Sequence, residues 1–260
     1  MNRVSITHQQ TNADPLPPSP LILAANWLYD FDPYSLVHAA VVVMTAATVT
    51  ALVVVGRRCR DTQHSQRCDN LVAGVALLCW VMANGWSLLP RNLAVANSIP
   101  LHVSDVVGLC VPLALTVGWR LPRAIVYFWG FGLTTQAYIS PTLTDGPATV
   151  AFWMFWLGHL AILAGAVYDI AVRHYRPTWP DFRLSLLALI CYAAIIVPLN
   201  MLLNVNYGYL GEASPDQPTL LLYLGPWPLR LLPMTALATL ALAIPMLAWV
   251  LLRRREERRA

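Results

Sequence analysis

Residues 35–56 read SLVHAAVVVMTAATVTALVVVG, and Arg57, Arg58 and Arg60 follow almost directly. No Asp, Glu, Lys or Arg interrupts these 22 residues. A helix needs roughly 20 apolar residues to cross the hydrocarbon core of a bilayer, and positively charged residues gather at the cytoplasmic end of such helices. The stretch therefore predicts a membrane-spanning helix that ends at the arginines.

The composition of the whole chain agrees with this reading. Of the 260 residues, 57% are hydrophobic and 12% are charged, whereas soluble domains carry about 25% charged residues. A soluble enzyme and a nucleic-acid-binding protein are therefore excluded. All 17 basic residues are arginine, and without lysine the chain cannot form a Schiff base or supply the lysine of a phosphate-binding loop.

The same criterion of length and hydropathy predicts an all-α fold, a bundle of seven transmembrane helices. Residues 34–252 form this domain, residues 253–260 form a basic cytoplasmic tail, and residues 1–33 form an extracytoplasmic tail with an interfacial segment. Trp27, Tyr29 and Phe31 favour the headgroup level there. Three prolines should kink the last span or delay its start. The seven predicted spans are 35–56, 70–89, 102–119, 122–140, 149–171, 183–203 and 226–252.

The arginines also predict the orientation. Fourteen of the 17 lie in the connections after the first, third and fifth spans or in the C-terminal tail. Under the positive-inside rule the N-terminus then lies outside and the C-terminus inside. The net charge of +4 is accounted for by topology and contact with lipid headgroups, so membrane lipids are the expected partners and nucleic acid is not.

Polar side chains inside the spans are the candidate functional residues, because burying them in a membrane is costly. They fall at mid-membrane or in the outer half, which predicts one polar cavity that opens outward. Asp169, at the inner end of the fifth span, is interpreted as a loop-side charge. The catalytic candidates are His102, Asp105 and His159, and the substrate-binding candidates are Asn84, Ser104, Gln136, Asn200, Asn204, Tyr207 and Arg230.

His102 and Asp105 form the sharpest pair, because residues three apart share a helical face. A carboxylate beside an imidazole raises its pKa and orients it as a general base. Alternatively, Asp105 only complements the N-terminus of a helix. His159 is either part of the site or a core histidine bonded to a neighbouring helix. Arg230 either pairs with Asp105, which we favour, or reaches outer headgroups.

The chain contains five cysteines without a C-x-x-C spacing, and it has neither an H-E-x-x-H nor a G-x-S-x-G string. These absences give no indication of a disulfide framework, a zinc site or a standard hydrolase motif. We therefore predict no metal and no cofactor.

Several short motifs resemble the YwaF-type bacterial integral membrane proteins. Residues 99–109, IPLHVSDVVGL, resemble the PLHLCD element of that family. The matching segments then continue in the family's order over about residues 34–250. They are YFWGFGLTTQA at 127–137, SP at 140–141, FW at 152–153, GH at 158–159, the asparagines 200, 204 and 206, and GPWP at 225–228.

That family is similar to transmembrane protein 164, an acyltransferase that remodels ether phospholipids through an acyl-enzyme on a cysteine beside a histidine. The resemblance implies a multi-pass protein of a bacterial cytoplasmic membrane, with His102 as the counterpart of that histidine. In this chain Leu101 stands before His102, and Ser104 occupies a position that is often cysteine in the bacterial relatives. Cys110 lies about two helical turns further on.

Two main hypotheses about function follow. In the first, the protein is a membrane-embedded acyl transferase or acyl hydrolase that acts on a lipid-type acyl ester at the outer leaflet. His102 is the general base oriented by Asp105, and His159 with Gln136 or Asn204 polarises the acyl carbonyl. In the second, it is a binding or transport protein for a small polar or amphiphilic solute. A structural or assembly role is a third alternative.

Overall fold

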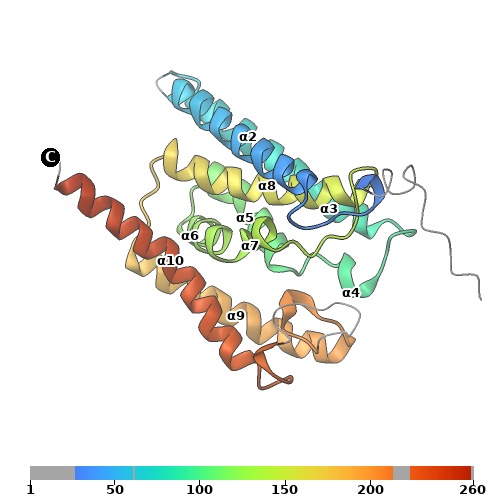
Figure 1. Cartoon of the computed structure of the whole chain (residues 1–260). Helices are drawn as coiled ribbons and strands as arrows, with labels where there is room; N and C mark the ends of the chain where they lie inside the picture. Colours follow the sequence, from blue (N-terminus) through green and yellow to red (C-terminus); the bar gives the residue numbers. More distant parts are fainter. Residues whose placement is uncertain (1–26, 61, 213–222, 259–260) are drawn as a thin grey trace, which may run out of the picture.

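The computed structural model describes residues 27–60, 62–212 and 223–258 (Figure 1). Within these ranges the chain is helical or loop, apart from an isolated β-bridge between Asp30 and Asp145. In chain order, the helices are α2 Leu36–Arg60, α3 Ser65–Leu88, α4 Val95–Ser98, α5 Val103–Thr116, α6 Arg120–Trp129, a π-helical turn η1 Gly130–Thr134, α7 Gln136–Ile139, α8 Val150–Ala171, α9 Trp179–Leu203, a 3-10 turn η2 Tyr207–Tyr209, and α10 Leu231–Glu257.

Five of these helices are long and apolar enough to cross a membrane, namely α2, α3, α8, α9 and α10. The all-helical, multi-pass membrane class predicted from the sequence is therefore confirmed. The third predicted span corresponds to α5, which has only 14 residues. The fourth corresponds to α6, η1 and α7, three short pieces that together cover residues 120–139.

The two short segments lie at the centre of the bundle. All residues from Ala124 to Trp129 in α6 are buried, and so are Val107, Val111 and Leu115 in α5. Backbone that is irregular or too short to span the bilayer is tolerated where protein shields it from lipid. Long apolar helices therefore surround a middle layer in which a π-turn and a broken helix are accommodated.

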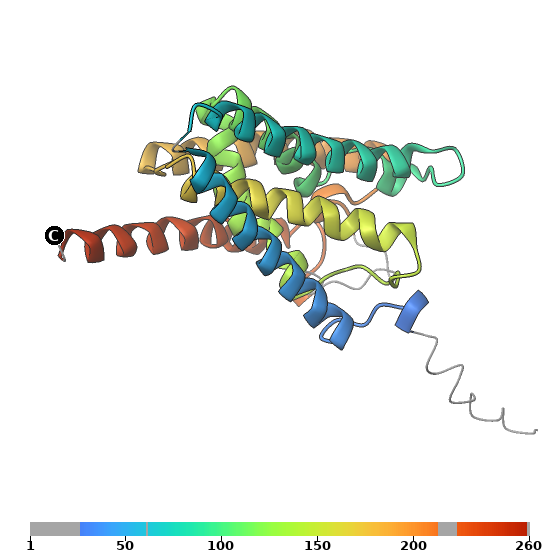
Figure 2. The same ribbon diagram turned by 90° about the horizontal axis from the view of Figure 1, so that it is seen from above.

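Helix α8 is the common neighbour in one half of the molecule. It packs against α2, α3, α5 and α6, whereas α9 packs against α6 and α10. Figure 1 shows α2, α3 and α8 running together, with α9 and α10 on the other side of α5 and α6. In Figure 2, the end of α10 extends beyond the neighbouring helices toward the C-terminus.

Three carboxylates are buried at the end of the bundle where the arginines gather: Asp181, which pairs with Arg120 of α6, and Asp69 and Asp169, which share one ion cluster. Asp69 of α3 accepts a hydrogen bond from the Tyr168 hydroxyl (2.8 Å), and its Oδ2 lies 3.1 Å from Arg173 and 3.4 Å from Arg60. Asp169 of α8 is bidentate with Arg123 of α6, at 2.8 and 2.9 Å.

This ion cluster (Arg60, Asp69, Arg123, Asp169 and Arg173) corrects the interpretation of Asp169 as a loop-side charge. Asp169 is only 2% exposed, and Arg173 lies 3.6 Å from its Oδ1. Arg173 also donates to the carbonyl of Ala114 in α5 (2.6 Å). The cluster therefore joins α2, α3, α5, α6 and α8 at one end.

The interfacial segment is described from Trp27 onward, so residues 1–26 of the predicted tail lie outside the described ranges. Trp27 and Tyr29 are exposed, as a headgroup position requires. Phe31 instead is buried among Phe152 and Trp156 of α8, and its backbone N–H donates to the carbonyl of Thr144 (2.7 Å).

Helix α10 begins at Leu231, after Pro228, so the proline-rich start of the predicted span is indeed delayed. Pro245 lies inside α10 and has no N–H, which leaves the carbonyl of Ala241 without its helical donor. The backbone of Gly132 in η1 packs closely against this carbonyl. A Cβ atom on Gly132 would lie 2.6 Å from the Ala241 oxygen.

We therefore expect Gly132→Ala to lower the free energy of unfolding by about 1–3 kcal/mol, the usual cost of overpacking a core. A thermal melt in detergent measures the change. Gly74→Ala in α3 is the matched control, because nothing lies within 4 Å of the added Cβ; it should be neutral or stabilising. Equal melting temperatures for the two variants would contradict the close packing of η1 on α10.

Candidate functional site

A cavity of about 490 Å³ lies between α3, α5, α8 and the loop that contains α4. We call it the α3–α5–α8 cavity. Its polar lining residues come from the end of α3, the α4 loop, the start of α5 and α8. These residues are Asn84, Ser87, Asn92, Ser98, His102, Ser104, Asp105 and His159.

The deeper lining is apolar. Ala76, Ala161 and Ile162 form part of it, together with the backbone of Gly108 and Gly158. Ala76 lies 12 residues before the end of α3, which corresponds to about 18 Å along a helix. The cavity thus runs from a polar mouth near the α4 loop to an apolar floor at about half the length of α3.

Asp105 caps helix α5. Its Oδ2 accepts a hydrogen bond from the backbone N–H of His102 (2.9 Å), and the Asn84 amide is within hydrogen-bonding reach of the carboxylate. The backbone carbonyl of Asp105 accepts a hydrogen bond from the indole of Trp80 (2.8 Å). The predicted pairing of carboxylate with imidazole is therefore replaced by the alternative, a carboxylate at a helix N-terminus.

The imidazole of His102 lies against the phenol ring of Tyr207, with 4.9 Å between the ring centroids, and it lines the cavity. Its backbone is held from both sides. Tyr192 of α9 donates its hydroxyl to the carbonyl of Leu101 (2.7 Å), and Asp105 accepts the His102 N–H. Asp105 therefore orients His102 through the main chain.

His159 lines the opposite side of the cavity, from α8. Its Nδ1 lies 2.7 Å from the carbonyl of Phe155 in the preceding turn. A carbonyl oxygen only accepts hydrogen bonds, so Nδ1 carries the proton and the lone pair is on Nε2. The ring packs on Phe155, with 4.3 Å between the centroids. In this tautomer His159 can accept a proton at Nε2.

Of the two nucleophile candidates, Ser104 lines the cavity and Cys110 does not. Cys110 packs against the main hydrophobic core. Leu101, which stands where the resemblance leads to a cysteine, packs beside Tyr207 in a separate apolar cluster. The hydroxyl of Ser104 is therefore the nucleophile candidate that the fold brings into the same cavity as both histidines.

Two residues expected in the same site lie elsewhere. Gln136 in α7 and Asn204 at the end of α9 are both exposed, and neither lines the cavity. Asn204 has a left-handed backbone (φ 52°) and ends α9. The prediction that these two amides face the histidines is therefore wrong.

Asn200, Tyr207 and Arg230 are engaged in the loop after α9. The Asn200 amide bonds both the N–H and the carbonyl of Tyr207, each at 2.9 Å. The Tyr207 hydroxyl accepts the N–H of Ile99 (3.1 Å) and donates to the carbonyl of Val95. Asn200 and Tyr207 thereby hold the segment that leads into His102.

Arg230 does not form the expected pair with Asp105. Its guanidinium is buried and donates to the carbonyl of Gly211 instead. Two residues that position the site were missed, namely Trp80 and Tyr192. The signal available in the sequence was that each is an aromatic with a polar tip inside a predicted span, and such groups find a hydrogen-bond partner when buried.

The fold and the cavity define a multi-pass helical membrane protein with a cavity between its helices that is polar at one end. A model of the TMEM164 family matches residues 33–246, and the chain belongs to this family. The motifs that resemble the family fall within the matched range. Neither a curated protein nor a solved structure matches the chain.

Proposed function

We propose that this protein is a membrane-embedded acyl transferase or acyl hydrolase that acts on a lipid-type acyl ester in the α3–α5–α8 cavity. The observation that carries the proposal is the distribution of groups in that cavity. Two histidines and three serines, Ser104 among them, line a cavity whose floor is apolar. An acyl chain is complementary to such a floor, and its ester carbonyl would then lie among the polar groups.

The histidines supply the acid–base chemistry. His102 acts as general base and takes the proton of the water or lipid hydroxyl that finally accepts the acyl group, while Asp105 is a positioning residue that acts through the His102 main chain. His159 offers a second basic nitrogen from α8, because its Nδ1 is committed to Phe155. The hydroxyl attacks the acyl carbonyl, and the departing alcohol takes the proton back from the histidine.

The attacking hydroxyl distinguishes two forms of the reaction. If it belongs to Ser104, an acyl-serine forms first and is then transferred to a second hydroxyl or to water. If it belongs to water or to a lipid hydroxyl, the transfer occurs in one displacement. His102 and Ser104 are two residues apart, and such side chains point in different directions on a helix. His159 is therefore the better base for the Ser104 hydroxyl, and His102 is the better base for the water or lipid hydroxyl.

The proposal includes the topology. Seven segments span the cytoplasmic membrane of a bacterium, with α5 and the α6–α7 segment as the two central ones, the N-terminus outside and the C-terminus inside. The ion cluster lies at one end of α3 and α8, and the polar mouth of the cavity lies toward the other end. With the arginines inside, the mouth faces the outer leaflet.

A binding or transport protein for a small polar or amphiphilic solute is the second candidate. Leu101 favours it, because the residue before His102 has no nucleophilic atom. The same cavity would then hold its ligand without any chemical step, and the histidines would act as hydrogen-bonding groups.

Reporter fusions test the topology. We expect reporters fused near residues 62, 121, 177 and 258 to give a cytoplasmic signal, and those near 95, 145 and 213 to give an external one, because the arginines resist translocation. An external signal near residue 177 together with a cytoplasmic one near residue 95 would contradict both the orientation and the outward-facing mouth.

The enzymatic role is tested by His102→Gln in purified protein, with transfer of a labelled acyl group from a phospholipid to a lysolipid or water as the measurement. Glutamine keeps a hydrogen-bonding side chain but cannot act as general base, so we expect activity to fall by roughly 10²–10⁴-fold. His64→Gln is the matched control, because His64 is exposed and lies outside the cavity.

Two further variants identify the attacking hydroxyl. Loss of activity in Ser104→Ala with full activity in Cys110→Ala supports the acyl-serine, whereas full activity in both assigns the attack to water or the lipid hydroxyl. If wild-type protein binds an amphiphilic ligand without transferring an acyl group, or if His102→Gln retains full transfer activity, the enzymatic proposal is wrong and the binding protein is favoured.

A further inference from the structure

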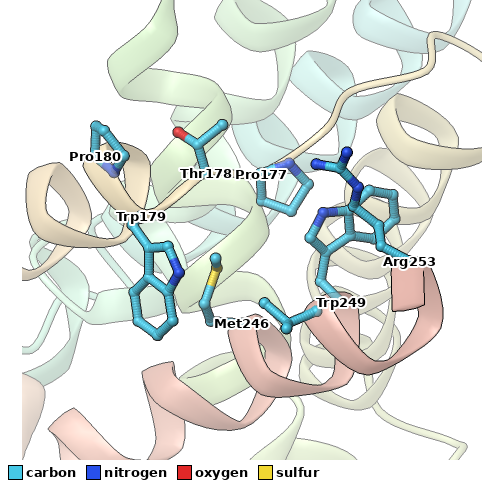
Figure 3. A pocket seen from close by; sticks show the side chains of 8 residues that line it. Pro177, Thr178, Trp179, Pro180, Met246, Trp249 and Arg253 are labelled. Atoms are coloured by element: carbon cyan, nitrogen blue, oxygen red, sulfur yellow. The ribbon is translucent and has the colours of Figure 1, made fainter. Parts of the chain in front are cut away.

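A second cavity, of about 270 Å³, lies at the basic end of the molecule. It is formed by the link from α8 to α9, the first turn of α9, and the last turns of α10. Figure 3 shows that the side chains of these two segments face one another across it. We call it the α9–α10 groove. It is lined by residues 177–180 and by Met246, Trp249, Val250 and Arg253.

The walls of the groove are mostly apolar and aromatic. The side chain of Trp179 is 50% exposed, whereas many other aromatic side chains of the protein are buried. Trp249 lines the facing side, with Met246 one turn before it. Exposed tryptophans at the end of a spanning helix are typical of the boundary between hydrocarbon and headgroups.

Cationic groups and an unused donor accompany these apolar walls. Arg253 lines the groove itself, and the guanidinium of Arg176 lies 5.2 Å from the centre of the Trp249 ring. The indole Nε1 of Trp249 is buried, and no hydrogen-bond partner for it lies in residues 27–60, 62–212 or 223–258. Buried donors in folded proteins are nearly always hydrogen-bonded, so this N–H is available to an acceptor on a bound molecule.

We propose that the α9–α10 groove binds an anionic glycerophospholipid from the leaflet at the basic end of the bundle. The phosphate lies beside Arg253, and a turn of the Trp249 indole lets its Nε1 donate a hydrogen bond to the phosphate. The upper part of one acyl chain lies against Trp179, Met246 and Val250. This site is separate from the α3–α5–α8 cavity and does not depend on the reaction proposed there.

The chemistry of the groove favours this occupant over a soluble anion. A free phosphate would find few polar donors among prolines, tryptophans, methionine and valine, and it would leave the apolar walls exposed. A phospholipid fits both the cationic and the apolar part of the groove. Its phosphate is complementary to arginine, and its acyl chain covers the apolar walls. The groove also lies where Arg253 and Arg254 follow the apolar part of α10, at the expected depth of headgroups.

Native mass spectrometry of the purified full-length protein, stripped of lipid in detergent and titrated with defined lipids, tests the proposal. The probes are phosphatidylglycerol, which is anionic, and phosphatidylcholine with the same chains, which is zwitterionic. We expect tighter binding of phosphatidylglycerol. In Arg253→Ala its dissociation constant should rise roughly tenfold, as expected for the loss of one charge-assisted contact.

Arg254→Ala is the matched control, because Arg254 follows directly, is exposed, and does not line the groove. It removes the same charge and should leave the affinity nearly unchanged. Trp249→Phe keeps the ring and removes the N–H, so it should weaken binding of phosphatidylglycerol. The melting temperature of the Arg253→Ala variant verifies that it keeps the fold.

Three outcomes would overturn the proposal. Equal affinity for the two lipids would mean that no anionic site exists. An equal loss in Arg253→Ala and Arg254→Ala would assign the binding to the general charge of the tail. Displacement of phosphatidylglycerol by millimolar inorganic phosphate would identify a site for a free anion rather than for a lipid.

Discussion

Two buried carboxylates, Asp69 and Asp169, hold the central helices of this bundle together at one end. Asp69 belongs to α3 and Asp169 to α8, and both carboxylates pair with Arg173. In addition, Arg60 pairs with Asp69 and Arg123 pairs with Asp169. A buried charge that loses its partner costs about 3–5 kcal/mol, so the helices that carry these groups are held in one arrangement. The ion cluster therefore fixes α2, α3, α5, α6 and α8 relative to one another at the basic end.

The same helices separate at their other ends. The C-terminal half of α3 and the N-terminal half of α8 line the α3–α5–α8 cavity. Bonds from Trp80, Tyr192 and Asp105 then fix the main chain around His102 at the mouth. An ion cluster at one end and a hydrogen-bonded main chain at the other give a preorganised cavity, which is what the proposed acyl transfer requires.

The sequence predicted the helical membrane class and the approximate positions of the five long apolar helices, because hydropathy and length are properties of local sequence. It also predicted how deep each polar residue lies, but depth does not determine which way a side chain faces. Gln136 follows a π-turn and Asn204 ends α9, and both are exposed and do not line the cavity. The spacing of His102 and Asp105 was equally compatible with an ion pair and a helix cap, and only the folded backbone distinguishes them.

The central claim is that the α3–α5–α8 cavity holds an acyl chain, and photocrosslinking measures this most directly. A phospholipid with a diazirine near the middle of one acyl chain is reconstituted with the protein, irradiated, and the modified peptides are sequenced. We predict labels on the apolar floor, at Ala76, Ala161 and Ile162, which a bulky Gly158→Trp substitution abolishes. Labels confined to the outer faces of α2 and α10, unchanged by that substitution, would contradict the account.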